Sequence, residues 1–127
     1  MRDLGSYLLE AAKTPWKDGV HDCSAWPARW AGIETPAYSS MDEAQALIDA
    51  AGGLVPLWEQ CIAGRLERVE TPEAGDVGII EAIGADRQSV QIGAIWTGKR
   101  WAFLSPTSLV SASAEAIAIW RRPCPRP

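Results

Sequence analysis

The sequence pattern changes at Gly64, and this change constrains the fold more than any other feature of the chain. Before Gly64, apolar residues recur at the three- and four-residue spacing of amphipathic helices. After Gly64, short β-rich runs alternate with turn residues, which is typical of strands. Helices followed by antiparallel strands indicate an α+β fold. With 127 residues, the chain is long enough for one domain with its own core.

Local start and stop signals set the ends of four expected helices. Asp22 is the predicted N-cap of the second helix, which carries Cys23 and ends at Gly32. Pro27 requires this helix to start late or to kink, because proline removes a backbone hydrogen bond beyond the first turn. The helices are expected at 2–13, from Asp22 to Gly32, 40–51 and 55–63.

The second half predicts an antiparallel sheet against which the helices pack. Turn residues at 84–86 and 97–99 are expected to close hairpins. The last seven residues, RRPCPRP, hold three prolines, so we expect 121–127 to be an extended tail outside a domain that covers 1–120. The strands are expected at 66–69, 76–82, 88–96, 100–104 and 115–121.

Composition excludes several classes of function. Twelve basic and sixteen acidic side chains give a net charge of −4, without a basic cluster before the C-terminus, which disfavours nucleic acid as a partner. Charged residues interrupt the N-terminal segment, and no apolar run is long enough to span a membrane, so neither a signal peptide nor a membrane segment is expected. The three cysteines are odd in number and lack metal-type spacing, which disfavours a disulfide framework and a zinc site and favours a reducing origin. No metal or cofactor is expected.

Seven tryptophans against one phenylalanine and two tyrosines are an unusual aromatic balance. Core filling explains a single tryptophan, but tryptophan is also enriched at protein interfaces. We expect at least one of the seven at an interface. Trp16, Trp26 and Trp30 flank the Asp22-Cys23 pair, so they are expected to form a packed or partner-facing cluster around it.

Cys23 is the candidate nucleophile. A thiol at the start of a helix faces unpaired N–H groups and the positive end of the helix dipole, which lower its pKa. Such a thiol needs a base, and the only histidine of the chain is His21, two residues before it. Residues so close on a loop usually point apart, so His21 is a weak candidate. Asp18, Asp22 and Asp76 could form an acidic patch beside Cys23, but two of them have capping or turn roles.

The segment Trp16 to Trp30, WKDGVHDCSAWPARW, resembles the nucleophile motif of NlpC-type cysteine peptidases, which cleave peptidoglycan stem peptides. Ala74 to Ile79 resembles the strand that follows in that family. Almost the whole chain is similar to a small domain family of uncharacterised function encoded among phage and prophage tail genes, through Gly52-Gly53-Leu54 and Ala118 to Arg121. These resemblances imply a papain-like single domain.

The catalytic histidine of the NlpC-type family opens a strand that reads H-V-G-I. The best matching segment here is Gln91 to Ala94, which puts Gln91 at the position of the base. A carboxamide cannot take a proton from a thiol near neutral pH. The resemblance therefore assigns to Cys23 the position of the nucleophile and no more, and a small buried thiol without catalysis is favoured.

The leading hypothesis is a structural component of a phage or prophage tail, near the tail tip, that keeps the hydrolase fold without the activity. It implies other tail proteins as partners, and a protein made in the bacterial cytoplasm and located in the virion. The alternative is an active cysteine peptidase or amidase that cleaves peptidoglycan peptide during entry, with His21 or a partner group as base. A third possibility is a host-facing regulator without a role in the virion.

Overall fold

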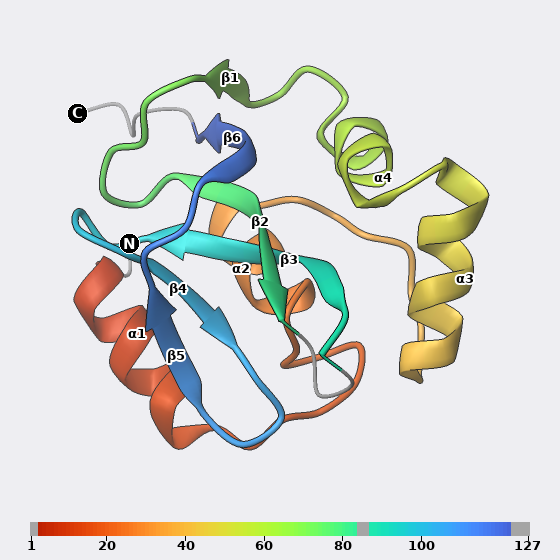
Figure 1. Cartoon of the computed structure of the whole chain (residues 1–127), viewed down its shortest axis with the longest axis horizontal. Helices are drawn as coiled ribbons and strands as arrows, with labels where there is room; N and C mark the ends of the chain where they lie inside the picture. The colour runs from red at the N-terminus through yellow and green to blue at the C-terminus, as the bar shows by residue number, and fades with distance from the viewer. Residues whose placement is uncertain (1–2, 84–86, 123–127) are drawn as a thin grey trace.

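A computed structural model gives the fold of the protein and describes residues 3–83 and 87–122. Four helices precede six strands, as the change of pattern at Gly64 predicts (Figure 1). The helices are α1 (Leu4–Lys13), α2 (Ala25–Ala31), α3 (Met41–Ala51) and α4 (Leu54–Ile62). The strands are β1 (Glu67–Val69), β2 (Val77–Ile83), β3 (Ser89–Trp96), β4 (Trp101–Leu104), β5 (Leu109–Ala112) and β6 (Ala116–Arg121).

The strands form one antiparallel sheet in the order β1-β6-β2-β3-β4-β5. The long β2–β3 hairpin forms its centre, and β6 returns to pair with β2 and β1. The predicted turn at 97–99 is confirmed, because the Thr97 N–H donates to the Arg100 carbonyl oxygen at 2.9 Å. The predicted turn at 84–86 lies outside the described residues.

The sequence analysis missed β5. This strand pairs with β4 at one edge of the sheet, and its residues are partly or fully exposed. Its sequence, LVSA, lies among serines and lacks a run of large β-branched residues. This strand forms because it pairs with the edge of β4. Such a tertiary contact leaves no strong local signal in the sequence.

The helix ends follow the expected chemistry. The Ser40 hydroxyl accepts the Glu43 N–H at 3.1 Å, and Gly52 ends α3 in the left-handed conformation. Gly32 likewise ends α2 with a φ of 74°. The second helix starts late, as Pro27 requires: Pro27 is the third helical residue, where its missing N–H costs no helical hydrogen bond.

The helices pack on one face of the sheet. The main core joins Tyr7 of α1, Trp26 of α2 and Trp58 of α4 to sheet residues that include Ile79 and Trp120. In Figure 1, α2 lies behind the crossing of β2 and β3, and α3 lies at the edge of the molecule. The other face carries a smaller cluster made of strand residues and Ala114. Three helices, α1, α2 and α4, therefore pack on one face, α3 packs mainly on α4, and the part of the chain that the structure describes has no helix on the other face.

Arg121 and Arg122, which were expected in the tail, contact the rest of the domain. Arg121 belongs to β6 and pairs with Glu67, and its guanidinium donates to the buried Asp76 carboxylate at 2.9 Å. Arg122 lies over the Trp30 ring at 3.7 Å from the centroid. Both arginines are thus part of the packed structure, and the rest of the predicted tail lies outside the described residues. Within the described residues, no helix is long and apolar enough to cross a membrane.

Candidate functional site around Cys23

Asp22 organises the loop that carries Cys23. Its side chain is fully buried, and each of its two oxygen atoms accepts two hydrogen bonds. Oδ1 accepts the N–H groups of Ser24 and Ala25 at 3.0 and 2.7 Å. Oδ2 accepts the Gly19 N–H and the Tyr38 hydroxyl, both at 2.7 Å. The prediction that Asp22 is the N-cap of α2 is wrong, because the N-cap is Ser24. Asp22 instead binds the backbone at the start of the helix from two residues before the N-cap, and it also ties the preceding loop and Tyr38 to it.

Cys23 lies in the turn before α2, and the expectation that the helix start lowers its pKa is wrong. Burial, and then the negative charge of Asp22, raise the Cys23 pKa to about 11, and a hydrogen bond with Ser24 opposes only part of this. The helix begins two residues after the thiol and has only seven residues. Asp22 accepts the N–H groups at its start, so a carboxylate charge stands where the sequence analysis expected a positive dipole.

His21 is a buried residue with a relative exposure of 6%. Its backbone pairs with Lys17 through two hydrogen bonds of 2.9 and 2.8 Å. The residue lines two small cavities on the α1 side, one of which reaches the β4–β5 turn.

The thiol of Cys23 has different neighbours. Its pKa depends on Asp22 and Ser24, and its charge acts on Tyr38. Ser24 and Tyr38 line a separate apolar pocket against α3 and α4. Among the described interactions, none joins His21 to Cys23 as a thiol–imidazole pair.

Gln91 is the third residue of β3 and pairs with Glu81 of β2. It shares a face of the sheet with Gly93, two residues further on. Gly93 packs directly on the Cys23 loop: a Cβ atom there would lie 2.9 Å from the Cys23 carbonyl oxygen and 2.8 Å from Cγ of Pro27. Gln91 is therefore on the helix-facing side of the sheet, one pleat away from this contact, and is exposed to solvent. Its carboxamide has no basic nitrogen that could deprotonate a thiol.

The acidic residues near this segment have separate structural partners. Asp18 accepts the Trp16 indole N–H at 2.6 Å. Asp76 accepts the Glu73 N–H at 2.7 Å and pairs with Arg121. Across residues 3–83 and 87–122, no group of three His, Cys, Asp or Glu side chains could hold a metal ion.

The sequence analysis did not identify Tyr38 as part of the site. The Tyr38 carbonyl oxygen packs on Gly19, where a Cβ atom would lie only 2.1 Å away, and its hydroxyl binds Asp22. Burial and the Asp22 carboxylate raise the Tyr38 pKa. Tyr38 lies sixteen residues after Asp22 in a segment without helix or strand, so no local pattern indicates the contact.

The tryptophans are mostly core residues. Trp26, Trp30, Trp58, Trp101 and Trp120 are buried, while Trp16 and Trp96 are partly exposed. Trp26 and Trp30 both pack against the Tyr7 ring, at centroid distances of 5.6 and 5.1 Å. The expected cluster around Cys23 is therefore packed inside the molecule at these two positions. Comparison of the chain with protein-family models, curated proteins and solved structures finds no match.

Proposed function

We propose that this protein is a structural component of a phage or prophage tail, near the tail tip, with a papain-like fold of the NlpC type that lacks peptidase activity. The observation that carries the loss of activity is the environment of Cys23: its pKa is raised to about 11, and its neighbours are a carboxylate and hydroxyl groups. A cysteine nucleophile needs thiolate at neutral pH and a base to protonate the leaving group. The tail assignment rests on the sequence resemblance alone.

The arrangement of the Cys23 loop supports the papain-like part of the proposal. A cysteine precedes a helix that packs on an antiparallel sheet, and β3, which follows the first strands, contacts the cysteine backbone through Gly93. In the family that the sequence resembles, the corresponding strand carries the histidine. Gln91 is the matching residue here, so the proposed protein has the fold of the family but lacks its histidine base.

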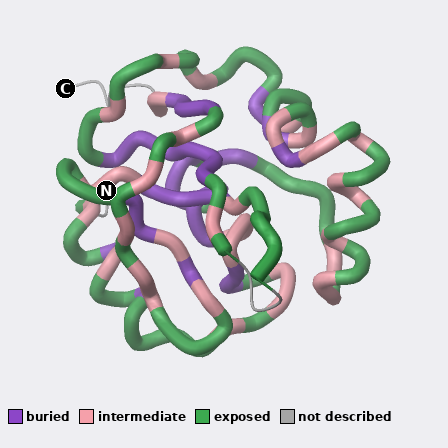
Figure 2. Tube along the Cα trace, viewed as in Figure 1, coloured by how far each residue is buried: buried purple, intermediate pink, exposed green. Residues whose placement is uncertain are grey.

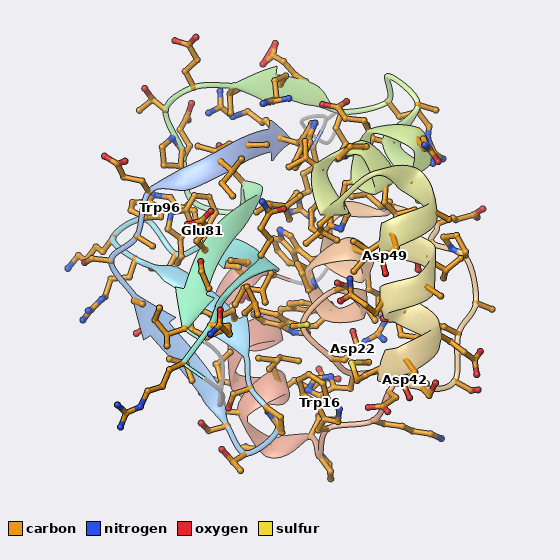
Figure 3. All side chains as sticks on the ribbon, turned by 45° about the vertical axis from the view of Figure 1, so that its right-hand side comes forward. Trp16, Asp22, Asp42, Asp49, Glu81 and Trp96 are labelled. Atoms are coloured by element: carbon orange, nitrogen blue, oxygen red, sulfur yellow. The ribbon has the colours of Figure 1, made fainter. Side chains whose placement is uncertain are left out.

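Contacts with other tail proteins would use the face of the sheet that no helix covers. We call this the outer face and define it by four residues on β3 and β4: Val90, Ile92, Trp96 and Phe103. All four are apolar and at least partly exposed, with Val90 at 40%. Trp96 packs edge-on against the buried Trp101 at 5.2 Å. Figure 3 places Trp96 at the opposite edge of the molecule from α3.

Thiol labelling tests the proposal that Cys23 is unreactive at neutral pH. In a Cys61→Ser/Cys124→Ser background, Cys23 is the only thiol, and iodoacetamide at pH 7 reports its reactivity. A pKa of about 11 against an ordinary 9.0 predicts a rate roughly 100-fold below that of the same chain unfolded in urea. A rate above that of the unfolded chain, lost in His21→Ala, would sink the proposal in favour of a peptidase.

Two further measurements separate the tail component from the alternatives. Purified protein and purified particles should fail to hydrolyse peptidoglycan, and Cys23→Ala should behave as wild type. Hydrolysis that Cys23→Ala abolishes would identify an active peptidase. Mass spectrometry of particles should find the chain at fixed stoichiometry, whereas its absence would favour a regulator without a role in the virion.

A further inference from the structure

The edge of the sheet is open beside the first half of β6. The three residues of β1 pair only with residues 119–121, the second half of β6 (Figure 1). On that side, Ala116, Ile117 and Ala118 have no strand partner among the described residues. An unpaired strand edge presents backbone N–H and C=O groups that can pair with another extended chain. This part of β6 can therefore accept a further strand in the place where β1 ends.

Ile117 is the exposed residue of this edge. The pairing of β6 with β2 shifts between Ala118 and Ala116, so within the described sheet Ile117 has no partner residue in that ladder either. It is the extra residue of a β-bulge, and such a residue is left unpaired. Ile117 is also 42% exposed. It thus offers a backbone position and an apolar side chain to the same partner.

A groove runs along the open edge. It has a volume of about 470 Å³ and is lined by residues 68–70 and by residues 116–119. This volume lies within the range of roughly 300–1,000 Å³ that is typical of ligand sites. Most of the lining residues are apolar, and they belong to strands or directly follow one. Such a groove fits a few residues of extended chain, whose backbone pairs with the edge while alternate side chains contact the groove.

The unpaired charges beside the groove are acidic. Glu70 lines it, and Glu115 directly precedes β6. Both are exposed, and neither has an ion-pair partner in the part of the chain that the structure describes. Arg68 also lines the groove, but its guanidinium is paired with Glu59 of α4 at 2.8 Å. Lysine or arginine side chains on the partner would complement this charge.

Two occupants from the chain itself fit less well. A second copy of this edge would bring the same carboxylates together, and the chain already carries a net charge of −4. The C-terminal residues 123–127 are basic, but three of the five are prolines, which lack the N–H group that ladder pairing needs. We propose that the open edge of β6 binds an extended, basic segment of a partner protein, which adds a strand beside residues 116–118 and places an apolar side chain against Ile117.

Nuclear magnetic resonance of the full chain tests the proposal with a peptide of alternating basic and apolar residues, acetyl-Lys-Val-Lys-Val-Lys-amide. This peptide should shift the amide signals of Ala116, Ile117 and Ala118 saturably. The same peptide methylated at every backbone nitrogen keeps its charges and side chains but cannot donate to the edge. Its affinity should be at least about tenfold lower, because backbone pairing supplies most of the affinity of an added strand.

Two variants and a matched control locate the site. Ile117→Lys should weaken the affinity for the peptide by about tenfold or more, because it removes the apolar contact and adds a like charge. Glu70→Gln should weaken it by about threefold, because one attractive charge is lost. Val90→Lys on the outer face is the control: Val90 is 40% exposed, and its substitution should leave the affinity unchanged. Unshifted signals in the rest of the spectrum check that each variant is folded.

Four outcomes would overturn the proposal. A shift that never saturates would show that the bulge blunts this edge. Equal binding of the methylated peptide would show charge attraction without strand addition. An equal effect of Val90→Lys and Ile117→Lys would exclude the edge as the site. A shift of the 116–118 signals with protein concentration alone would assign the edge to a second copy of the chain. The edge includes neither Cys23 nor the outer face, so the proposed tail function does not depend on this test.

Discussion

At the scale of single residues, the buried carboxylate of Asp22 holds together three parts of the chain. It accepts hydrogen bonds from Gly19 before it, from the first turn of α2 after it, and from Tyr38 across the loop. The sequence predicts only the capping role, because capping is local. Contact with Tyr38 depends on the path of the chain between α2 and α3, and one sequence gives no signal for that path.

Asp22→Ala is expected to destabilise the fold by about 2–4 kcal/mol, since it leaves several buried donors unpaired. Tyr38→Phe is the matched control: it removes one of the four donors and should cost about 1 kcal/mol. Urea unfolding measures both free energies. Equal costs for the two variants would contradict a shared role of Asp22 for the loop, the helix and Tyr38.

The raised pKa of Cys23 predicts how stability depends on pH. The folded pKa of about 11 lies above the ordinary 9.0, so the folded state favours the neutral thiol. This contribution is fully present below pH 9 and is lost as the pH rises through 11, because the unfolded thiol ionises first.

The free energy of unfolding should therefore fall more steeply between pH 8.5 and 10.5 in the Cys61→Ser/Cys124→Ser background than in the same background with Cys23→Ala. The difference between the two curves isolates Cys23 from lysine and tyrosine titration. Parallel curves would show that the thiol titrates normally in the folded state.

At the scale of elements, local signals predict most of the chain. All four helices and five of the six strands lie within a few residues of their expected positions, because caps, glycine stops and the Pro27 constraint act locally. The start of α2 was placed too early, since Asp22 caps from two residues further back than an ordinary N-cap. That shift puts Cys23 before the helix, and its pKa is raised by burial and then by the charge of Asp22.

Gly93 is the residue of the sheet that packs on the Cys23 loop, and a substitution at Gly93 tests this packing. A Cβ atom there would lie 2.7 Å from Trp58 and 2.8 Å from Pro27, both in the core. Gly93→Ala is expected to destabilise the fold by about 2–3 kcal/mol through overpacking. Gly5→Ala in α1 is the control, because its Cβ would have only an ordinary contact at 3.5 Å.

Gly5→Ala should leave the stability unchanged or raise it by up to about 0.5 kcal/mol, since Gly5 lies in the first turn of α1, where the helix preference of alanine counts for less than in the interior. Thermal unfolding of both variants makes the comparison. A neutral Gly93→Ala would show that β3 and α2 have room to separate, and the close contact would then not fix the position of the Cys23 loop.

At the scale of the whole molecule, the sequence predicts which residues have the chemistry of a base and a nucleophile, but it does not predict which of them are in contact. His21 and Cys23 are two residues apart, yet His21 lines cavities on the α1 side while Cys23 interacts with Tyr38 on the α3 side. Burial of His21 is also in part a tertiary effect, because the β4–β5 turn near it is distant in sequence. The candidate site thus depends on packing between layers.

The elements differ in local stability, and α3 is expected to be the least stable helix. None of its residues is buried, and Figure 2 shows only partly buried and exposed positions along it. It packs mainly on α4, which buries Leu54, Trp58 and Ile62 in the core. Local stability follows buried contacts, so α3 should open without the rest of the domain.

Hydrogen exchange should therefore give α3 amides an opening free energy at least about 2 kcal/mol below that of α4 and of the β2–β3 hairpin. Residues of α3 line one side of the apolar pocket that Ser24 and Tyr38 also line. Opening of α3 should therefore increase the access of reagents to Cys23. Leu47→Ala in α3 should speed both α3 exchange and Cys23 labelling, while Leu9→Ala on the exposed face of α1 should change neither. Equal protection of α3 and α4 would mean that both helices unfold with the core, and the slow labelling of Cys23 would then report its pKa alone.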